Sequence, residues 1–161
     1  MFLLRLFSFG VYRVEGAGLS QKGSNVGYIE NMPKNAPQGQ ISQKNRVYTQ
    51  SEIDEMTQNT LHPLILRKLI KCESQNTNVA RIDSNGIMSY GILQFNGSAT
   101  WNTFAPLAGV TNSAMNPIAA IKVSDWMISH HAGGRWTCWH ILGMMYMPNG
   151  QIFVPTSTSS L

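Results

Sequence analysis

One segment without a sustained apolar pattern, residues 19–48, limits how much of this 161-residue chain can fold. The segment is rich in Gln, Asn, Gly, Ser and Lys and contains Pro33 and Pro37. This composition is typical of a flexible linker, because it offers few side chains to bury. Residues 149–161 end in a run of Thr and Ser, which predicts a disordered tail. The sequence therefore predicts one domain over residues 51–148, since a chain of this length supplies one hydrophobic core.

The first twelve residues are mostly apolar, but Arg5 interrupts them. They are followed by Glu15-Gly16-Ala17-Gly18, a poor match to the cleavage site of a secretory signal. A truncated export signal and a plain hydrophobic tail both fit this pattern. No run approaches the roughly 20 apolar residues that span a membrane. Residues 1–50 are therefore interpreted as a flexible basic linker, with or without an export signal at its start.

The basic charge of the chain is confined to its first fifty residues. These contain six Lys or Arg and two Glu, whereas residues 51–161 contain six basic and six acidic residues. A neutral domain has no cationic stripe that could track phosphates, so nucleic acid is not expected as a partner. The leader fits a weak association with an anionic wall or membrane surface.

Helical patterns dominate the predicted domain. Ser51 followed by acidic residues is typical of a helix start, and residues 62–74 show apolar positions at helical spacing. One or two helical turns are expected at residues 98–104. A longer helix is predicted to begin after the cap residue Asn116 and to end at Gly133-Gly134.

A short strand region separates these helices. Residues 83–86 form a turn cluster, and residues 87–95 are apolar and interrupted by glycine, which suits a small β-hairpin. The fold class is therefore α+β and mainly helical. His130 and His131 follow the long helix without a third ligand at suitable spacing, so no metal site and no cofactor are expected.

Glu73 lies on the apolar side of the helix predicted at residues 62–74. It comes three residues after Ile70, four after Leu69 and seven after Leu66, which places all four on one helical face. A carboxyl group at such a position is either a surface residue on a fraying turn or an acid that burial keeps protonated. A protonated carboxylic acid is what cleavage of a glycosidic bond requires.

Four short strings in a fixed order carry a resemblance to a known superfamily. They are Cys72-Glu73-Ser74-Gln75-Asn76, Ser89-Tyr90-Gly91-Ile92-Leu93-Gln94-Phe95, Ser98-Ala99-Thr100-Trp101 and Trp136-Thr137-Cys138. This layout resembles the lysozyme-like superfamily, and is closest to resuscitation-promoting-factor domains and small soluble lytic transglycosylases. The resemblance spans residues 64–139, about half of the chain. It implies a lysozyme-like fold with a small β-hairpin.

The same resemblance implies a function and a set of site residues. The expected substrate is the glycan strand of peptidoglycan, cut between N-acetylmuramic acid and N-acetylglucosamine with Glu73 as the acid. The chain is expected to act as a monomer, secreted or associated with the cell envelope. The candidate substrate-binding residues are Ser74, Ser89, Tyr90, Gln94, Thr100 and Trp101. Gln94 also suits a structural hydrogen bonder, and Trp101 also suits a core residue.

Cysteine count alone allows one long-range disulfide between Cys72 and Cys138 or two buried thiols. The layout of the resembling family, with one Cys beside the acid and one in the terminal Trp-x-Cys string, favours the disulfide. Such a bond is typical of exported proteins.

The identity of a second acid separates the possible mechanisms. Ser89 stands where c-type lysozymes have their second carboxylate, which leaves Asp83 and Asp125 as other candidates. With one acid, the simplest mechanism is that of a lytic transglycosylase, which forms a 1,6-anhydro sugar end. The alternatives are a hydrolytic muramidase that uses a second acid, and a glycan-binding module without activity.

Overall fold

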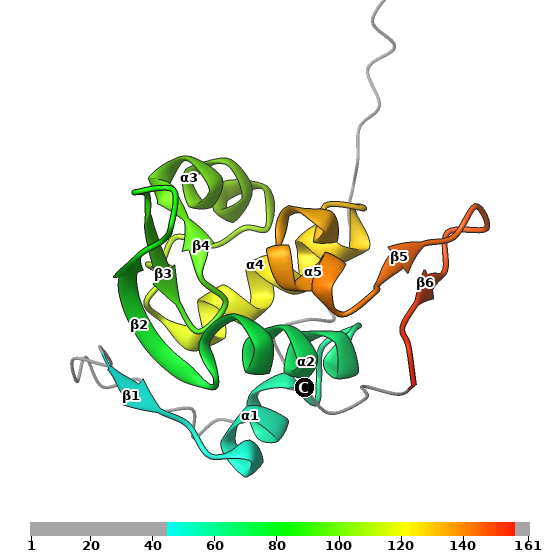
Figure 1. Ribbon diagram of the computed structural model, residues 1–161, viewed down its shortest axis with the longest axis horizontal. Coiled ribbons are helices and arrows are strands. Elements are labelled where there is room, and N and C mark those ends of the chain that lie inside the picture. The colour runs from blue at the N-terminus through cyan, green and yellow to red at the C-terminus, as the bar shows by residue number, and fades with distance from the viewer. Residues whose placement is uncertain (1–44, 157–161) are drawn as a thin grey trace, which may run out of the picture. The chain divides into compact units, whose positions relative to one another are not determined.

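The computed structural model describes residues 45–156, apart from the side chains of residues 97 and 98. Within this range the fold is α+β, which confirms the predicted class, and it contains five α-helices and two small antiparallel sheets (Figure 1). The helices are α1 (Gln50–Thr57), α2 (Pro63–Ser74), α3 (Gly97–Leu107), α4 (Pro117–Ser129) and α5 (Thr137–Ile141), with a 3₁₀ turn, η1 (Gly133–Arg135). No helix among these residues is long and apolar enough to cross a membrane.

The larger sheet has the strand order β1-β2-β3-β4. Its strands are β1 (Arg46–Val47), β2 (Thr77–Ile82), β3 (Met88–Gly91) and β4 (Phe95–Asn96). The hairpin predicted from residues 87–95 is thus larger than expected, because β2 pairs with β3 across the turn cluster at residues 83–86. The smaller sheet pairs β5 (Met145–Tyr146) with β6 (Ile152–Phe153).

The ordered domain extends beyond both boundaries expected from composition. β1 pairs with β2, and Tyr48 is 5% exposed and belongs to the core. The N-cap of α1 is Thr49 rather than Ser51, and it forms a reciprocal capping box with Glu52. β6 lies in the segment expected to be a disordered tail. Residues 1–44 and 157–161, with the rest of the predicted leader and tail, lie outside the described residues.

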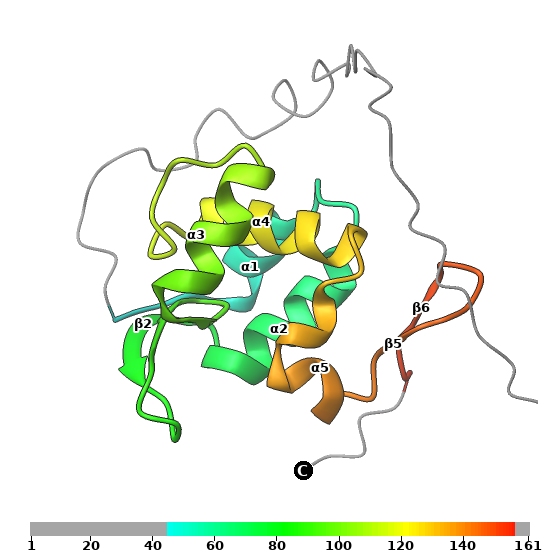
Figure 2. The same ribbon diagram turned by 90° about the horizontal axis from the view of Figure 1, so that it is seen from above.

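Two helices begin where the sequence predicts. Pro63 occupies the first turn of α2, where its missing N–H costs no hydrogen bond, and α2 ends at Ser74. The Asn116 side chain accepts a hydrogen bond from the Ala119 amide and caps α4. Views from two directions place α2 and α4 in the middle of the molecule (Figures 1 and 2). Their buried faces form much of the core, including Leu66, Leu69, Ile70, Ile121, Val123, Met127 and Ile128.

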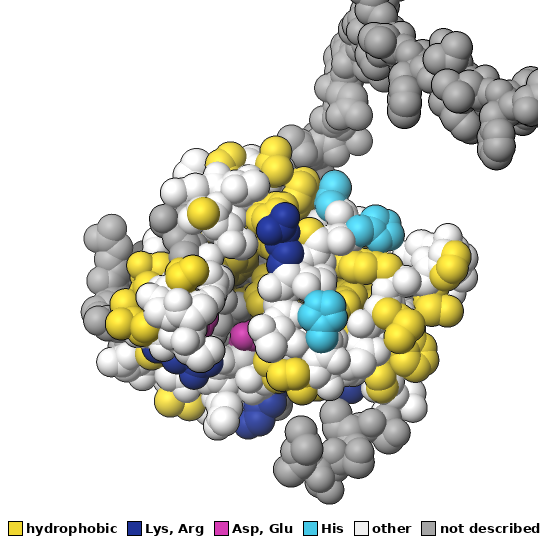
Figure 3. All heavy atoms as spheres, turned by 45° about the horizontal axis from the view of Figure 1, so that its top comes forward, with side chains coloured by type: hydrophobic (Ala, Val, Ile, Leu, Met, Phe, Trp, Pro, Cys, Tyr) yellow, Lys and Arg dark blue, Asp and Glu magenta, His cyan; other side chains and the backbone are white. Residues whose placement is uncertain are grey.

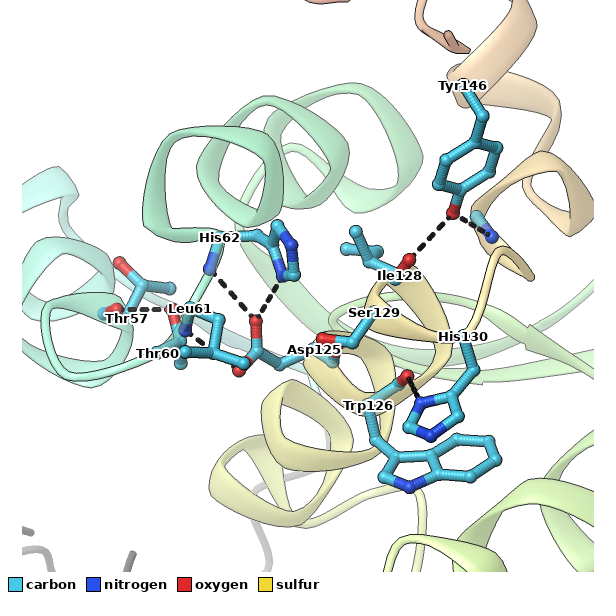
Figure 4. A network of polar contacts seen from close by, with 11 residues as sticks. Thr57, Thr60, Leu61, His62, Asp125, Trp126, Ile128, Ser129, His130 and Tyr146 are labelled. Carbon is cyan, nitrogen blue, oxygen red and sulfur yellow. Dashed lines mark hydrogen bonds and ion pairs between the residues drawn. The ribbon is translucent and has the colours of Figure 1, made fainter. Parts of the chain in front are cut away.

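Asp125 joins α4 to the start of α2. Its carboxylate accepts hydrogen bonds from the amides of Leu61, at 2.9 Å, and His62, at 3.0 Å, and lies 2.9 Å from His62 Nδ1 (Figure 4). The His62 side chain forms no capping hydrogen bond at the N-terminus of α2. Asp125, which is 3% exposed, instead supplies acceptors for the backbone amides there.

A tight turn connects β3 to β4. Gly91 has a φ of +80°, and a Cβ there would lie 2.2 Å from the carbonyl oxygen of Ala114. Gln94 also has a positive φ, and its Nε2 donates to the carbonyl oxygens of Val79, at 2.9 Å, and Gly91. The turn therefore requires glycine at position 91, and the Gln94 amide ties the turn to β2.

Candidate active site around Glu73

Glu73 lies in the last turn of α2, between α5 and the β2 side of the larger sheet. Its Oε1 accepts a hydrogen bond of 3.0 Å from the backbone amide of Cys138 in α5. On the other side, the guanidinium of Arg81 in β2 donates to the backbone carbonyl oxygen of Glu73. A distant segment thus fixes the carboxyl group of this residue, and the next strand along the chain fixes its backbone.

Burial raises the pKa of the Glu73 carboxyl group above that of an ordinary glutamate. Desolvation raises the pKa of its carboxyl group, and the negative charge of Asp83 raises it further. The hydrogen bond from Cys138 and the positive charge of Arg81 lower this pKa, but desolvation is the largest effect. The side chain is half-buried, so the acid retains access to solvent. A carboxyl group in this state keeps its proton to higher pH than an ordinary glutamate, as a proton donor in catalysis requires.

The disulfide between Cys72 and Cys138 is present, as predicted. It joins α2 to α5 with a Cα–Cα distance of 5.9 Å. Cys72 immediately precedes Glu73, and Cys138 supplies the amide that binds the Glu73 carboxylate. The covalent bond therefore holds the acid and its hydrogen-bond donor together.

Three of the six candidate substrate-binding residues are buried and bonded internally. The Ser74 hydroxyl, 2.7 Å from the Ile92 carbonyl oxygen, ties α2 to the β3–β4 turn. Ser89 is fully buried, and its hydroxyl donates to the Asp83 carboxylate. Gln94 is 6% exposed and has the structural role described above. Burial and these internal hydrogen bonds disfavour direct substrate contact by the side chains of Ser74 and Ser89, for which a sugar contact stays a prediction.

The other three candidates keep part of their surface exposed. Tyr90 in β3 and Thr100 and Trp101 in α3 are partly buried. The ring of Trp101 packs edge-on against the ring of Phe95, with 4.8 Å between centroids, and Phe95 in turn contacts Trp136. Trp101 therefore packs on the core, as one of the two expectations for this residue states, and its sugar contact stays a prediction.

Asp83 is the candidate second acid that lies near Glu73. Its Oδ2 accepts hydrogen bonds from the Ser89 hydroxyl and, at 3.1 Å, from the side-chain Nδ2 of Asn96. Its charge acts on the Glu73 carboxyl group. Asp125 is not in this position, because it caps the other end of α2, about 16 Å away along the helix.

The site also contains contacts that the sequence did not predict. Arg81 was not considered, and neither was the amide of Cys138. No local pattern in the sequence marks Arg81, because its contact with Glu73 depends on the register of β2 against β3, which places Arg81 opposite Ser89. Figure 3 shows one face of the molecule, on which acidic side-chain atoms lie in a depression.

Comparison with known proteins does not identify a related site. No family model matches this chain, and neither curated proteins nor solved structures show significant similarity to it.

Proposed function

We propose that this protein is a lytic transglycosylase with a lysozyme-like fold, which cleaves the β-1,4 bond between N-acetylmuramic acid and N-acetylglucosamine in peptidoglycan. The observation that carries the proposal is the state of Glu73, a half-buried carboxyl group with a raised pKa and one fixed amide donor. The four strings that resemble the lysozyme-like superfamily support the choice of substrate.

In the proposed reaction, Glu73 donates its proton to the glycosidic oxygen as the bond to the anomeric carbon of the muramic sugar breaks. The resulting carboxylate then accepts the proton of that sugar's 6-hydroxyl group. The 6-oxygen attacks the anomeric carbon and closes a 1,6-anhydro ring. No water is consumed, and Glu73 recovers its proton. The attacking hydroxyl belongs to the bound sugar, so its attack has the advantage of an intramolecular step.

Asp83 supports a second candidate function, hydrolysis by a muramidase. It is a carboxylate that influences Glu73, and a hydrolase uses a second carboxylate to hold water or to attack the sugar. Two hydrogen bonds to Oδ2 and the turn hydrogen bonds of its backbone also give Asp83 a structural role. We therefore rank hydrolysis below the transglycosylase reaction.

The products of peptidoglycan digestion distinguish these functions. Digestion in heavy-oxygen water, followed by mass spectrometry, should yield unlabelled muropeptides with 1,6-anhydro ends. Labelled reducing ends would establish hydrolysis instead, and Asp83→Asn would then abolish activity. Glu73→Gln is expected to lose about a hundredfold or more in rate, whereas the exposed control Glu55→Gln should retain it. Binding without cleavage by the unsubstituted protein would indicate a glycan-binding module.

The disulfide supports a location outside the reducing cytosol, as expected for an enzyme of the cell wall. We propose that the protein is exported and meets its substrate as a monomer. Retention of the disulfide in protein recovered from the culture medium or the cell envelope, tested by thiol alkylation, would support this location.

A further inference from the structure

Arg135 is a basic residue near the candidate site that the proposed reaction does not use. It ends η1, three residues before Cys138, whose amide binds Glu73. Its guanidinium lies over the ring of Phe104 in α3, 4.9 Å from the centroid. Arg135 therefore bridges η1 and α3, and η1 leads directly into α5, whose Cys138 amide binds the acid.

The guanidinium of Arg135 remains available for a ligand. The ion pairs among residues 45–156 involve Arg46, His62 and Arg67, and Arg135 forms none with a described carboxylate. The residue is exposed, and a cation–π contact with Phe104 uses the face of the guanidinium charge without consuming its N–H donors. This planar fork is suited to binding a carboxylate through two hydrogen bonds.

The backbone that carries Arg135 is held firmly. The Gly133 amide donates to the Tyr146 hydroxyl at 2.8 Å, and this hydroxyl donates to the Ile128 carbonyl oxygen at 3.0 Å (Figure 4). A Cβ at Gly133 would lie 2.5 Å from the ring of Trp139, so η1 packs directly on the core. A cation on such a support is positioned before a ligand arrives, which lowers the entropic cost of binding.

We propose that Arg135 is a specificity-determining residue that binds a carboxylate of the glycan substrate. This inference rests on the proposed function, because peptidoglycan carries carboxylates and a chitin chain of N-acetylglucosamine carries none. The carboxylate belongs either to the peptide stem or to the lactyl group, which is free once the stem has been removed. Arg135 thereby gives the site a preference for acidic strands.

Equilibrium binding to the Glu73→Gln protein tests the proposal without cleavage of the ligand. The ligands are strands with peptide stems, strands stripped by an amidase, and neutral chitin oligosaccharides. In the Glu73→Gln background, the second substitution Arg135→Gln should weaken binding to at least one acidic ligand about tenfold and leave chitin binding unchanged. The acidic ligand that loses affinity identifies the carboxylate. Arg135→Lys should restore part of the affinity, and Arg46→Gln, the same charge change on β1, should have no effect.

Two results would overturn the inference. Equal losses for acidic and neutral ligands would show that Arg135 only supports Phe104, and unchanged binding of all ligands would show that it contacts none. If the unsubstituted protein neither binds nor cuts peptidoglycan, the proposed function itself fails. That outcome is distinct from a protein that cuts peptidoglycan equally well with and without Arg135.

Discussion

Removal of the disulfide should cost this domain a large share of its stability. The bond joins residues 66 positions apart. In the chain-entropy model, closing a loop of this length restricts the unfolded chain enough to stabilise the fold by about 4 kcal/mol. Domains of this size commonly have a total stability of roughly 5–15 kcal/mol. Cys72→Ala with Cys138→Ala should therefore remain folded at 25 °C only by a narrow margin.

Thermal unfolding followed by circular dichroism measures this loss directly. A decrease of about 4 kcal/mol corresponds to a midpoint lower by about 15 °C for a domain of roughly one hundred residues. Addition of a reductant to the unsubstituted protein should produce a similar decrease, and the same reductant should not affect the double variant. A midpoint that falls by less than about 4 °C would refute the reasoning, because the loss would then be near 1 kcal/mol.

Three further predictions concern the acid, the cap of α2 and the N-terminal boundary. In the proposed reaction Glu73 must be protonated, so activity falls as the pH rises through its pKa. The charge of Arg81 lowers that pKa, so Arg81→Met should move the falling limb of the pH–rate profile to higher pH. Arg81→Lys, which keeps the charge, should move it less. Asp125→Ala removes the acceptor of two partly buried amides at the start of α2 and should reduce the free energy of unfolding by about 2 kcal/mol in a denaturant titration. A fragment that begins at Ser51 lacks the buried Tyr48 and the α1 cap Thr49, and should be about 3 kcal/mol less stable than a fragment that begins at Asn45. Equal stability of the two fragments would contradict a structural role for β1.

Local signals in the sequence were sufficient for much of the helical structure. Pro63 and the apolar spacing after it determine α2, and Asn116 marks the start of α4, because caps and periodicity act within a few residues. The position of Glu73 on an apolar face followed from the same periodicity. These features depend on neighbours along the chain, and the sequence displays such neighbours directly.

Features that depend on distant partners could not be predicted in the same way. β1 consists of two exposed residues, Arg46 and Val47, without an apolar alternation, and it exists because Asn78 and Thr77 pair with it. Ser89 was assigned to the substrate from its place in the resembling string, whereas in the fold its side chain is buried and its hydroxyl donates to Asp83. Burial and register arise from the whole fold, which a local pattern does not contain.

Gly91 and Gln94 constrain how chains of this kind can diverge. The string Tyr90-Gly91-Ile92-Leu93-Gln94, which carries much of the resemblance, serves a backbone turn that passes against the Ala114 carbonyl group. Folding alone is enough to preserve the glycine and the amide, even in a descendant that has lost its activity. Glu73 is different, since a carboxyl group with a raised pKa lowers stability at neutral pH. Under the proposed function, the acid rather than the more recognisable string is therefore the position at which an active chain and an idle relative would differ.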